Sequence, residues 1–381
     1  MRFSLTNIAL QLKKGNKSLF DYSIDVQYAY LDSLGNPIDD IDRSYKQFLC
    51  QNFFVSKLKS IVLDVISFIL IPFFIILLFI NNFGVKYVHD VDAIGEDHHM
   101  EEVFPQILKE KYVIDTKAWH SGVCLSFKDL KYVFKKIIGW KHPYFVLKII
   151  IKIATYSACI KRYHPKAFII NGEYSFSSSI LTNYCHTRNV KHINVMHGEK
   201  LCFIRDSFFH FDECYVWGQH YIDMFIRQKA ESSQFIIAVP ESLSFDCNQY
   251  INPLTYADYK YYLAIYTEKE IKSIVHSLSY LKQKGNTIKY RIHPRYSDVN
   301  LLRKYVNEDE IEYPSKVSIF ESISNMQYAI GSYTTVLLQA FFSKKGVILD
   351  DVTYLKRYYQ LKDYGYFLST MNVDRLSELI K

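Results

Sequence analysis

The sequence predicts an α/β protein with two Rossmann-like domains that face a cleft. Short apolar strands alternate with helix-length segments from about residue 165 onward. The same alternation starts again near residue 255, after a segment at 240–253 that reads as a linker. The chain has 381 residues and is 49% hydrophobic, which is enough for two full cores. We therefore expect a first domain over residues 1–245 and a second over residues 255–381.

Composition narrows the class of function. The net charge of +7 is spread along the chain, which fits an anionic substrate or an anionic membrane surface better than a nucleic acid. The seven cysteines are odd in number and show no C-x-x-C spacing, which indicates reduced thiols in a cytosolic protein and no zinc site. The first 18 residues lack the apolar core of a signal peptide. The chain also has no P-loop, no G-x-G-x-x-G and no G-x-S-x-G motif.

The amino-terminal third gives weaker patterns. Residues 22–32 alternate as a strand does, residues 35–37 predict a turn, and residues 85–88 predict a short strand.

One segment of this third, residues 61–80, is nearly continuous in apolar side chains and has about the length that spans a bilayer. Asp64 and Pro72 interrupt it, so we expect a buried or interfacial hairpin broken at Pro72, with a spanning helix as the alternative. Residues 144–162 predict a core helix with a solvated edge, or else a helix on a membrane face.

The later segments are easier to assign. In the first domain we expect strands at 167–170, 192–195 and 213–217 and a helix at 177–185. In the second domain, capping boxes at Thr267/Glu270 and Ser318/Glu321 predict two helix starts. Expected strands there are 261–266, 288–292, 328–330 and 346–349, with an apolar helix at 336–342.

Polar residues follow four of these strands, at the ends where open α/β sheets bind ligands. Residues 171–173 end in Glu173, residues 197–200 contain His197, Glu199 and Lys200, and two later strands lead to His293 and to Ser332.

Ser332, Thr334 and Thr335 begin a helix, where free amides and hydroxyls suit a phosphate, although plain N-capping explains them equally well. His293 is held by Pro294, with Arg295 beyond. We expect these three residues to contact the nucleotide, with His293 donating to the same phosphate; the alternative is an ordinary strand end.

Glu173 and His197 are the candidates for taking a proton from an acceptor hydroxyl. Their alternatives are a carboxylate at a helix start and an ordinary turn histidine. Glu199 and Lys200 are assigned to acceptor binding, or else pair with each other on a loop. We expect no metal site. Asp90 and Asp92 form a D-x-D pattern, but they lie in a solvated acidic run.

These residues resemble the bacterial two-domain glycosyltransferases of the GT-B type, particularly the sialyltransferases. That family carries an acidic D/E-D/E-G motif, an H-P motif and a Ser-Ser/Thr motif, in this order. His293 and Pro294 match the second motif, residues 331–335 look like the third with its hydroxyls spread, and residues 171–173 resemble the first with glycine and acid exchanged. The resemblance covers about residues 165–350. It implies Glu173 as base, with His293, Ser332, Thr334 and Thr335 holding CMP.

The CDP-glycerol glycerophosphotransferases of teichoic-acid synthesis are a second resemblance. Their H-G, R-x-H-P and Ser-rich motifs look like residues 196–198, 291–294 and 332–335, and there His197 is the base. Capsule Kdo transferases are similar in general outline.

The sialyltransferase resemblance implies an inverting, metal-independent transfer of sialic acid from CMP-sialic acid to a glycan hydroxyl in O-antigen or capsule synthesis. No cofactor is expected beyond this CMP-sugar donor. The expected partners are a lipid-linked oligosaccharide acceptor and a membrane surface, without nucleic acid, and the expected place is the cytoplasmic face of the cell membrane. The alternatives are a CDP-glycerol or Kdo transferase, and a non-catalytic membrane-associated assembly protein with a degenerate transferase fold.

Overall fold

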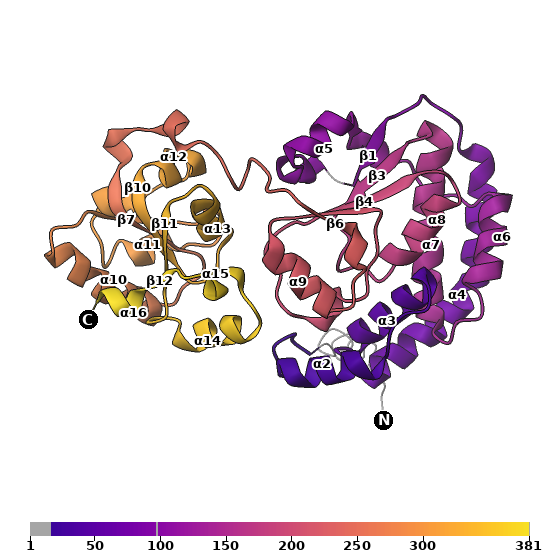
Figure 1. Cartoon of the computed structure of the whole chain (residues 1–381), viewed down its shortest axis with the longest axis horizontal. Coiled ribbons are helices and arrows are strands. Elements are labelled where there is room, and N and C mark those ends of the chain that lie inside the picture. Colours follow the sequence, from indigo (N-terminus) through magenta and orange to yellow (C-terminus); the bar gives the residue numbers. More distant parts are fainter. Residues whose placement is uncertain (1–16, 97, 381) are drawn as a thin grey trace. The chain divides into compact units, whose positions relative to one another are not determined.

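Two parallel sheets organise the chain. The computed structural model describes residues 17–96 and 98–380 and divides the chain into two units at Ala238 (Figure 1). Residues 198–201 group with unit 2 because Glu199 accepts a hydrogen bond from the backbone amide of Phe367 there, at 3.1 Å. The predicted first domain, which contained Glu199 and Lys200, therefore differs from unit 1 at this loop.

Unit 1 contains a six-stranded parallel sheet in the order β2-β1-β3-β4-β5-β6. Its strands are β1 (Ala93–Gly95), β2 (Ile114–Asp115), β3 (Ala167–Ile170), β4 (Lys191–Val195), β5 (Glu213–Val216) and β6 (Phe235–Ile237). Its helices are α2 (Ile24–Ser33), α3 (Asp40–Asn52), α4 (Lys57–Gly84), α5 (Gln106–Lys111), α6 (Phe127–Lys136), α7 (Pro143–Tyr163), α8 (Ser178–His186) and α9 (Gln219–Arg227).

Unit 2 contains a second six-stranded parallel sheet, in the order β12-β11-β10-β7-β8-β9. Its strands are β7 (Ala257–Tyr262), β8 (Ile288–Arg291), β9 (Ile311–Glu312), β10 (Met326–Gly331), β11 (Gly346–Leu349) and β12 (Asp374–Arg375). Its helices are α10 (Glu268–Gln283), α11 (Val299–Leu302), α12 (Ile319–Ser324), α13 (Thr335–Phe342), α14 (Leu355–Asp363), α15 (Phe367–Thr370) and α16 (Leu376–Leu379). The two predicted Rossmann-like α/β domains are thus confirmed.

Three expectations for the amino-terminal third are wrong. Residues 24–33 form helix α2, because Ser23 caps the Val26 amide and the buried Gln27, Tyr28 and Leu31 recur with helical spacing. Residues 85–88 form no strand; β1 is the first strand within the described residues.

Pro72 does not break the apolar segment, which is one continuous helix, α4. Pro72 lies on the exposed side of this helix, so its ring displaces no packed neighbour. By length and composition, α4 and α7 are both apolar enough to cross a membrane. The most apolar stretch of α7 is 61% buried, which identifies α7 as the expected core helix. The corresponding stretch of α4 is only 11% buried.

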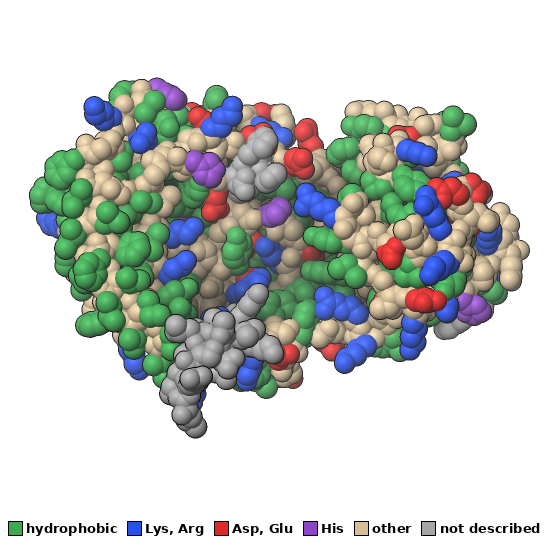
Figure 2. All heavy atoms as spheres, turned by 180° about the vertical axis from the view of Figure 1, so that it is seen from behind, with side chains coloured by type: hydrophobic (Ala, Val, Ile, Leu, Met, Phe, Trp, Pro, Cys, Tyr) green, Lys and Arg blue, Asp and Glu red, His purple; other side chains and the backbone are tan. Residues whose placement is uncertain are grey.

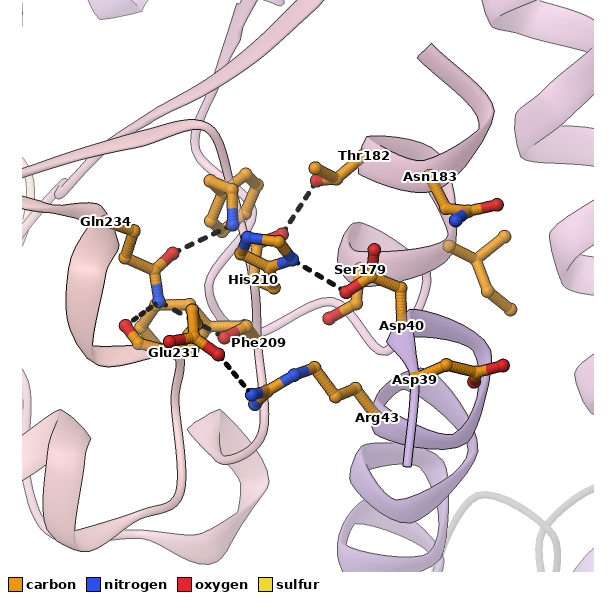
Figure 3. A network of polar contacts seen from close by, with 12 residues as sticks. Asp39, Asp40, Arg43, Ser179, Thr182, Asn183, Phe209, His210, Glu231 and Gln234 are labelled. Carbon is orange, nitrogen blue, oxygen red and sulfur yellow. Dashed lines mark hydrogen bonds and ion pairs between the residues drawn. The ribbon is translucent and has the colours of Figure 1, made fainter. Parts of the chain in front are cut away.

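The amino-terminal helices are part of unit 1 rather than an appendage. In Figure 3, Asp40 and Arg43 of α3 reach toward the core: Asp40 lies 2.6 Å from Nδ1 of His210, and Arg43 donates to the Glu231 carboxylate at 2.6 Å. Ser44 accepts from the amide of Ile180 in α8 at 2.9 Å. Because these contacts join positions more than 130 residues apart, no local sequence pattern predicts them.

A buried ion cluster links three elements of unit 2. Glu312 of β9 accepts from Lys260 of β7 at 2.6 Å and from Arg291 of β8 at 2.7 Å, and it also accepts from the Ser322 hydroxyl. Burial raises the pKa of the Glu312 carboxyl, but the Lys260 ammonium outweighs this effect and holds the pKa below its usual value. The cluster fixes the registers of β7, β8 and β9 and so the edge at which these strands end.

The Glu312→Gln variant should lose about 3–5 kcal/mol of stability, because it leaves buried Lys260 and Arg291 without their carboxylate. Differential scanning calorimetry should show the transition of unit 2 lowered by at least about 6 °C. The matched control is Glu308→Gln, whose exposed carboxylate pairs with Arg303, and it should leave the transition nearly unchanged. Equal shifts for the two variants would contradict the structural role of the cluster.

Candidate functional site

The topological switch point of the unit 2 sheet carries a pocket. From β7 the chain continues to β8 and β9 on one side of β7, and later returns to its other side with β10. Connections that diverge in this way leave a crevice outside the carboxyl ends of the two central strands. A pocket of about 240 Å³ occupies this position. It is lined by Tyr261, Tyr262, Leu263, Ala264, Ile265, Ser332, Tyr333, Thr334, Tyr354 and Arg357.

Two residues of the predicted hydroxyl motif line this pocket. Ser332 and Thr334 are in the lining, between the end of β10 and the start of α13. The Thr334 hydroxyl caps α13 by accepting from the Val336 amide at 3.4 Å. Thr335 is the first residue of the helix and is exposed, but it is not part of the lining. The pocket therefore meets a helix start with its free amides and partial positive charge.

Arg357 adds a cation that sequence reasoning missed. It comes from α14, and its guanidinium lies 5.4 Å from the centre of the Tyr333 ring. Burial, together with Glu270 and Asp350, raises the pKa of the neighbouring Tyr354, so that this hydroxyl stays protonated and able to donate. Arg357 lies beyond the motifs in sequence and follows no pattern, so only the fold identifies it.

His293 lies at the same sheet edge, beside the pocket. Its amide donates to the Ser297 hydroxyl at 2.8 Å, and that hydroxyl donates to the carbonyl of Ala264, a lining residue, at 3.0 Å. The imidazole stacks on Tyr296, with ring centres 4.5 Å apart. The sequence-predicted histidine is thus tied by one hydroxyl to the wall of the pocket but is not in its lining.

The protonation state of His293 follows from its contacts. Nδ1 accepts a hydrogen bond from the amide of Arg295 at 3.1 Å, so the proton of the neutral ring is on Nε2. Partial burial and the charge of Arg295 lower the pKa of His293. At neutral pH this side chain therefore offers an Nε2–H donor. Pro294 and Arg295 are themselves exposed in the turn that follows.

The unit 1 sheet has its own switch point, between β1 and β3, and a second pocket lies there. Its volume is about 270 Å³. It is lined by Gln51, Glu96, Lys148, Lys152, Tyr156, Ile170, Asn171, Gly172, Tyr174, Ser175, Phe176, Ser177, Ser178 and Leu181.

Charged residues of the unit 1 pocket come from two elements. Lys148 and Lys152 stand one turn apart on α7, and Nζ of Lys152 lies 3.9 Å from the carboxylate of Glu96, which follows β1. The same carboxylate accepts from the Asn171 amide at 3.3 Å. The Asn171 side-chain oxygen is buried and accepts no hydrogen bond from the described residues. Sequence reasoning missed these groups because α7 read as a core helix and Glu96 lies in an acidic run.

The predicted proton acceptors have different surroundings. Glu173 is fully buried and does not line the unit 1 pocket. Its carbonyl accepts from Gln47 at 2.8 Å. Burial lowers the pKa of the nearby Arg205, but Asp206 and, to a smaller extent, the Glu173 carboxylate raise it above its ordinary value. His197 follows β4 and is exposed. The structure therefore does not bring Glu173 and His197 together in one pocket.

The remaining predicted residues have structural contacts. Lys200 is buried in the short loop that belongs to unit 2. Asp90 pairs with His164 at 3.1 Å, and Asp92 with Lys166 at 2.9 Å. The Lys166 hydrogen bond holds the pKa of Asp92 below its usual value. Among the side chains that the structure describes, those of residues 17–96 and 101–380, no group of three or more His, Cys, Asp or Glu is placed to hold a metal ion.

No family model and no curated protein matches the chain. Solved structures with a similar fold include a UDP-N-acetylglucosamine 2-epimerase from Rickettsia bellii, with 13% identity, a TM-score of 0.38, and 69% of this chain and 79% of that chain covered. They also include the wall teichoic acid polymerase TagF, with 12% identity, a TM-score of 0.41, and 60% of this chain and 66% of that chain covered. A third is the glycotransferase of kitacinnamycin, with 6% identity, a TM-score of 0.42, and 72% of this chain and 84% of that chain covered. At these low TM-scores the similarities assign no activity to this chain.

The Gly172→Ala variant should disturb the unit 1 pocket. A Cβ at this position would lie 2.5 Å from Cδ1 of Ile170 and 3.0 Å from the Ser178 hydroxyl oxygen, so the buried Ile170 side chain or the turn itself must shift. We expect a loss of about 1–3 kcal/mol, measured by thermal unfolding. Gly84→Ala is the control, since no atom lies within 4 Å of its Cβ position. Wild-type stability in the Gly172 variant would contradict the close packing of this turn.

Proposed function

We propose that this chain is a glycosyltransferase and that the unit 2 pocket holds the nucleotide of its donor. The observation that carries the proposal is the set of groups at the switch point. Ser332, Thr334, the start of α13 and Arg357 all offer donors or positive charge to a phosphate.

The donor we propose is CMP-sialic acid. This choice is supported by the resemblance of His293, Pro294 and the 332–335 segment to the sialyltransferase motifs, and by the position of His293 next to the pocket wall. A CDP-glycerol or Kdo donor is the alternative, because it presents the same cytidine and phosphate groups. All three donors would therefore place a phosphate against the same donor groups of the pocket.

The reaction proposed is a single inverting displacement. The acceptor hydroxyl attacks the anomeric carbon while the bond from that carbon to the phosphate oxygen breaks, and CMP leaves with the electron pair. The Nε2–H of His293 and the α13 amides stabilise the charge that grows on the phosphate. The hydroxyl proton passes to a base. We propose the exposed His197 for this role, because Glu173 is fully buried.

The acceptor we propose is a lipid-linked glycan of O-antigen or capsule synthesis, at the cytoplasmic face of the membrane. In unit 1, the switch-point pocket offers Lys148 and Lys152 to anionic groups of such an acceptor, and the carboxylate of Glu96 and the amide oxygen of Asn171 to its hydroxyls. This pocket replaces Glu199 and Lys200 as the proposed acceptor site, because those two residues group with unit 2.

Thermal unfolding with CMP, CDP, UDP, GDP and ADP tests the donor assignment. A ligand that binds only the native state raises its stability by mass action. We expect CMP to give the largest shift, with EDTA having no effect, and Arg357→Ala to lower the affinity for CMP about tenfold or more. Arg303→Ala is the matched control. The Arg303 guanidinium pairs with the exposed Glu308 carboxylate, so we expect this variant to bind CMP as the wild type does. A shift by UDP or GDP that EDTA abolishes would contradict the proposal.

The pH dependence of CMP binding tests the role of His293. Its pKa is lowered, so the ring is neutral above its ordinary pKa of about 6.5 and the Nε2–H donor is present throughout the range from neutral to weakly alkaline pH. We expect calorimetric affinity for CMP to stay constant over this range and His293→Ala to weaken it about tenfold or more. A steady loss of affinity as the pH rises through neutrality would show that binding needs the imidazolium instead.

A further inference from the structure

A charge-free apolar stripe runs along the outer side of α4. Its members are spaced three or four residues apart and are each more than half exposed: Val65, Ile69, Phe73, Ile76, Ile80 and Phe83. The stripe is about 27 Å long at the rise of an α-helix. Between Lys59 and Lys86 the only charged residue is Asp64. Figure 2 shows hydrophobic side chains gathered along the edge of unit 1 that carries α4. A continuous apolar surface of this size indicates a binding surface rather than ordinary exposure.

Hydrogen bonds and an ion pair join α4 to the two ends of α7, near both ends of the stripe. At one end, the Asp64 carboxylate lies 2.8 Å from Nδ1 of His142 and accepts from the Tyr144 amide at 3.0 Å. At the other end, Lys161 donates to the carbonyl of Asn82 at 2.5 Å. These partners begin and end α7, a helix in which eleven of the 21 residues are buried in the unit.

These contacts with α7 restrict the orientation that α4 can take in a membrane. A helix that crossed the bilayer would have to give up the Asp64 and Lys161 bonds or draw the core helix α7 in with it. Lying in the interface plane keeps every bond and buries the outward stripe in the acyl boundary.

The neighbouring helix α6 supplies the matching charge. Its Lys128, Lys131, Lys135 and Lys136 are exposed, and its one acid, Asp129, is buried and paired with Arg188. The same helix begins with Phe127, which is 75% exposed and lies 4.9 Å, ring centre to ring centre, from Phe79 of α4. Lysines beside an exposed apolar surface are the pattern that anionic lipid headgroups attract.

We propose that unit 1 docks in the plane of an anionic lipid bilayer, with the α4 stripe inserted at the acyl boundary and the α6 lysines on the headgroups. The occupant is a bilayer surface and not a second protein. The exposed lysines of α6 lie on the helix next to the stripe, and a second copy of this chain would bring the same positive charges against them. The proposal goes beyond the proposed transfer reaction and does not require it.

Vesicle flotation of the full chain tests the proposal. We expect the wild type to float with phosphatidylcholine vesicles that contain phosphatidylglycerol, to bind pure phosphatidylcholine more weakly, and to lose binding as salt is raised. The double variant Ile69→Glu/Phe73→Glu should lower the partition coefficient about tenfold or more, since it puts charge into the acyl boundary. Lys135→Glu/Lys136→Glu should abolish the preference for anionic vesicles.

The matched control is Val113→Glu/Leu254→Glu, which adds the same charge at highly exposed apolar residues outside α4 and should bind as the wild type does. Wild-type binding by the Ile69/Phe73 variant would overturn the proposal. So would binding that ignores both salt and lipid charge, which would favour a spanning helix. A dimer that the same variant dissociates, without any vesicle binding, would show that a second copy covers the stripe. The CMP-induced thermal shift of the α4 variant, expected to be unchanged, keeps this test separate from the donor assignment.

Discussion

Parallel strand pairing is the constraint on which the candidate sites depend. Each described strand pairs with its neighbours in parallel, so within each sheet all carboxyl ends lie at one edge. Where the chain changes direction between β7 and β10, and between β1 and β3, the connecting segments part and leave a pocket. In unit 2 the buried contact of Glu312 with Lys260 and Arg291 holds three of these strands in register. The chemistry of each pocket is then supplied by residues that follow the strands.

Much of unit 2 could be predicted from the sequence, because its signals are local. The capping box of Thr267 and Glu270, the alternation before His293 and the hydroxyls at 332–335 each lie within a few residues of the element they define. Arg357 could not be predicted, since it reaches the pocket only through the fold. In unit 1 the sequence pattern does not predict the helices α2 and α3 or the unbroken course of α4. Long-range contacts hold these helices in place, such as that between Asp40 and His210.

Helix α7 connects two features of unit 1. Its apolar core packs inside the unit, Lys148 and Lys152 line the switch-point pocket, and its two ends bind α4. The surface proposed to meet the membrane is therefore attached to the same rigid helix as the cations proposed to bind the acceptor. Under the two proposals, α7 would hold the bilayer surface and the acceptor pocket of unit 1 in a fixed relation.

The switch-point pocket of unit 2 is proposed to bind a cytidine nucleotide through its phosphate. A crystal structure of the protein with CMP would reveal the contacts themselves. We expect difference density for the phosphate against Ser332, Thr334 and the first amides of α13, with Nε2 of His293 within hydrogen-bond distance. Nucleotide density elsewhere on the chain, or an empty pocket at saturating CMP, would contradict it.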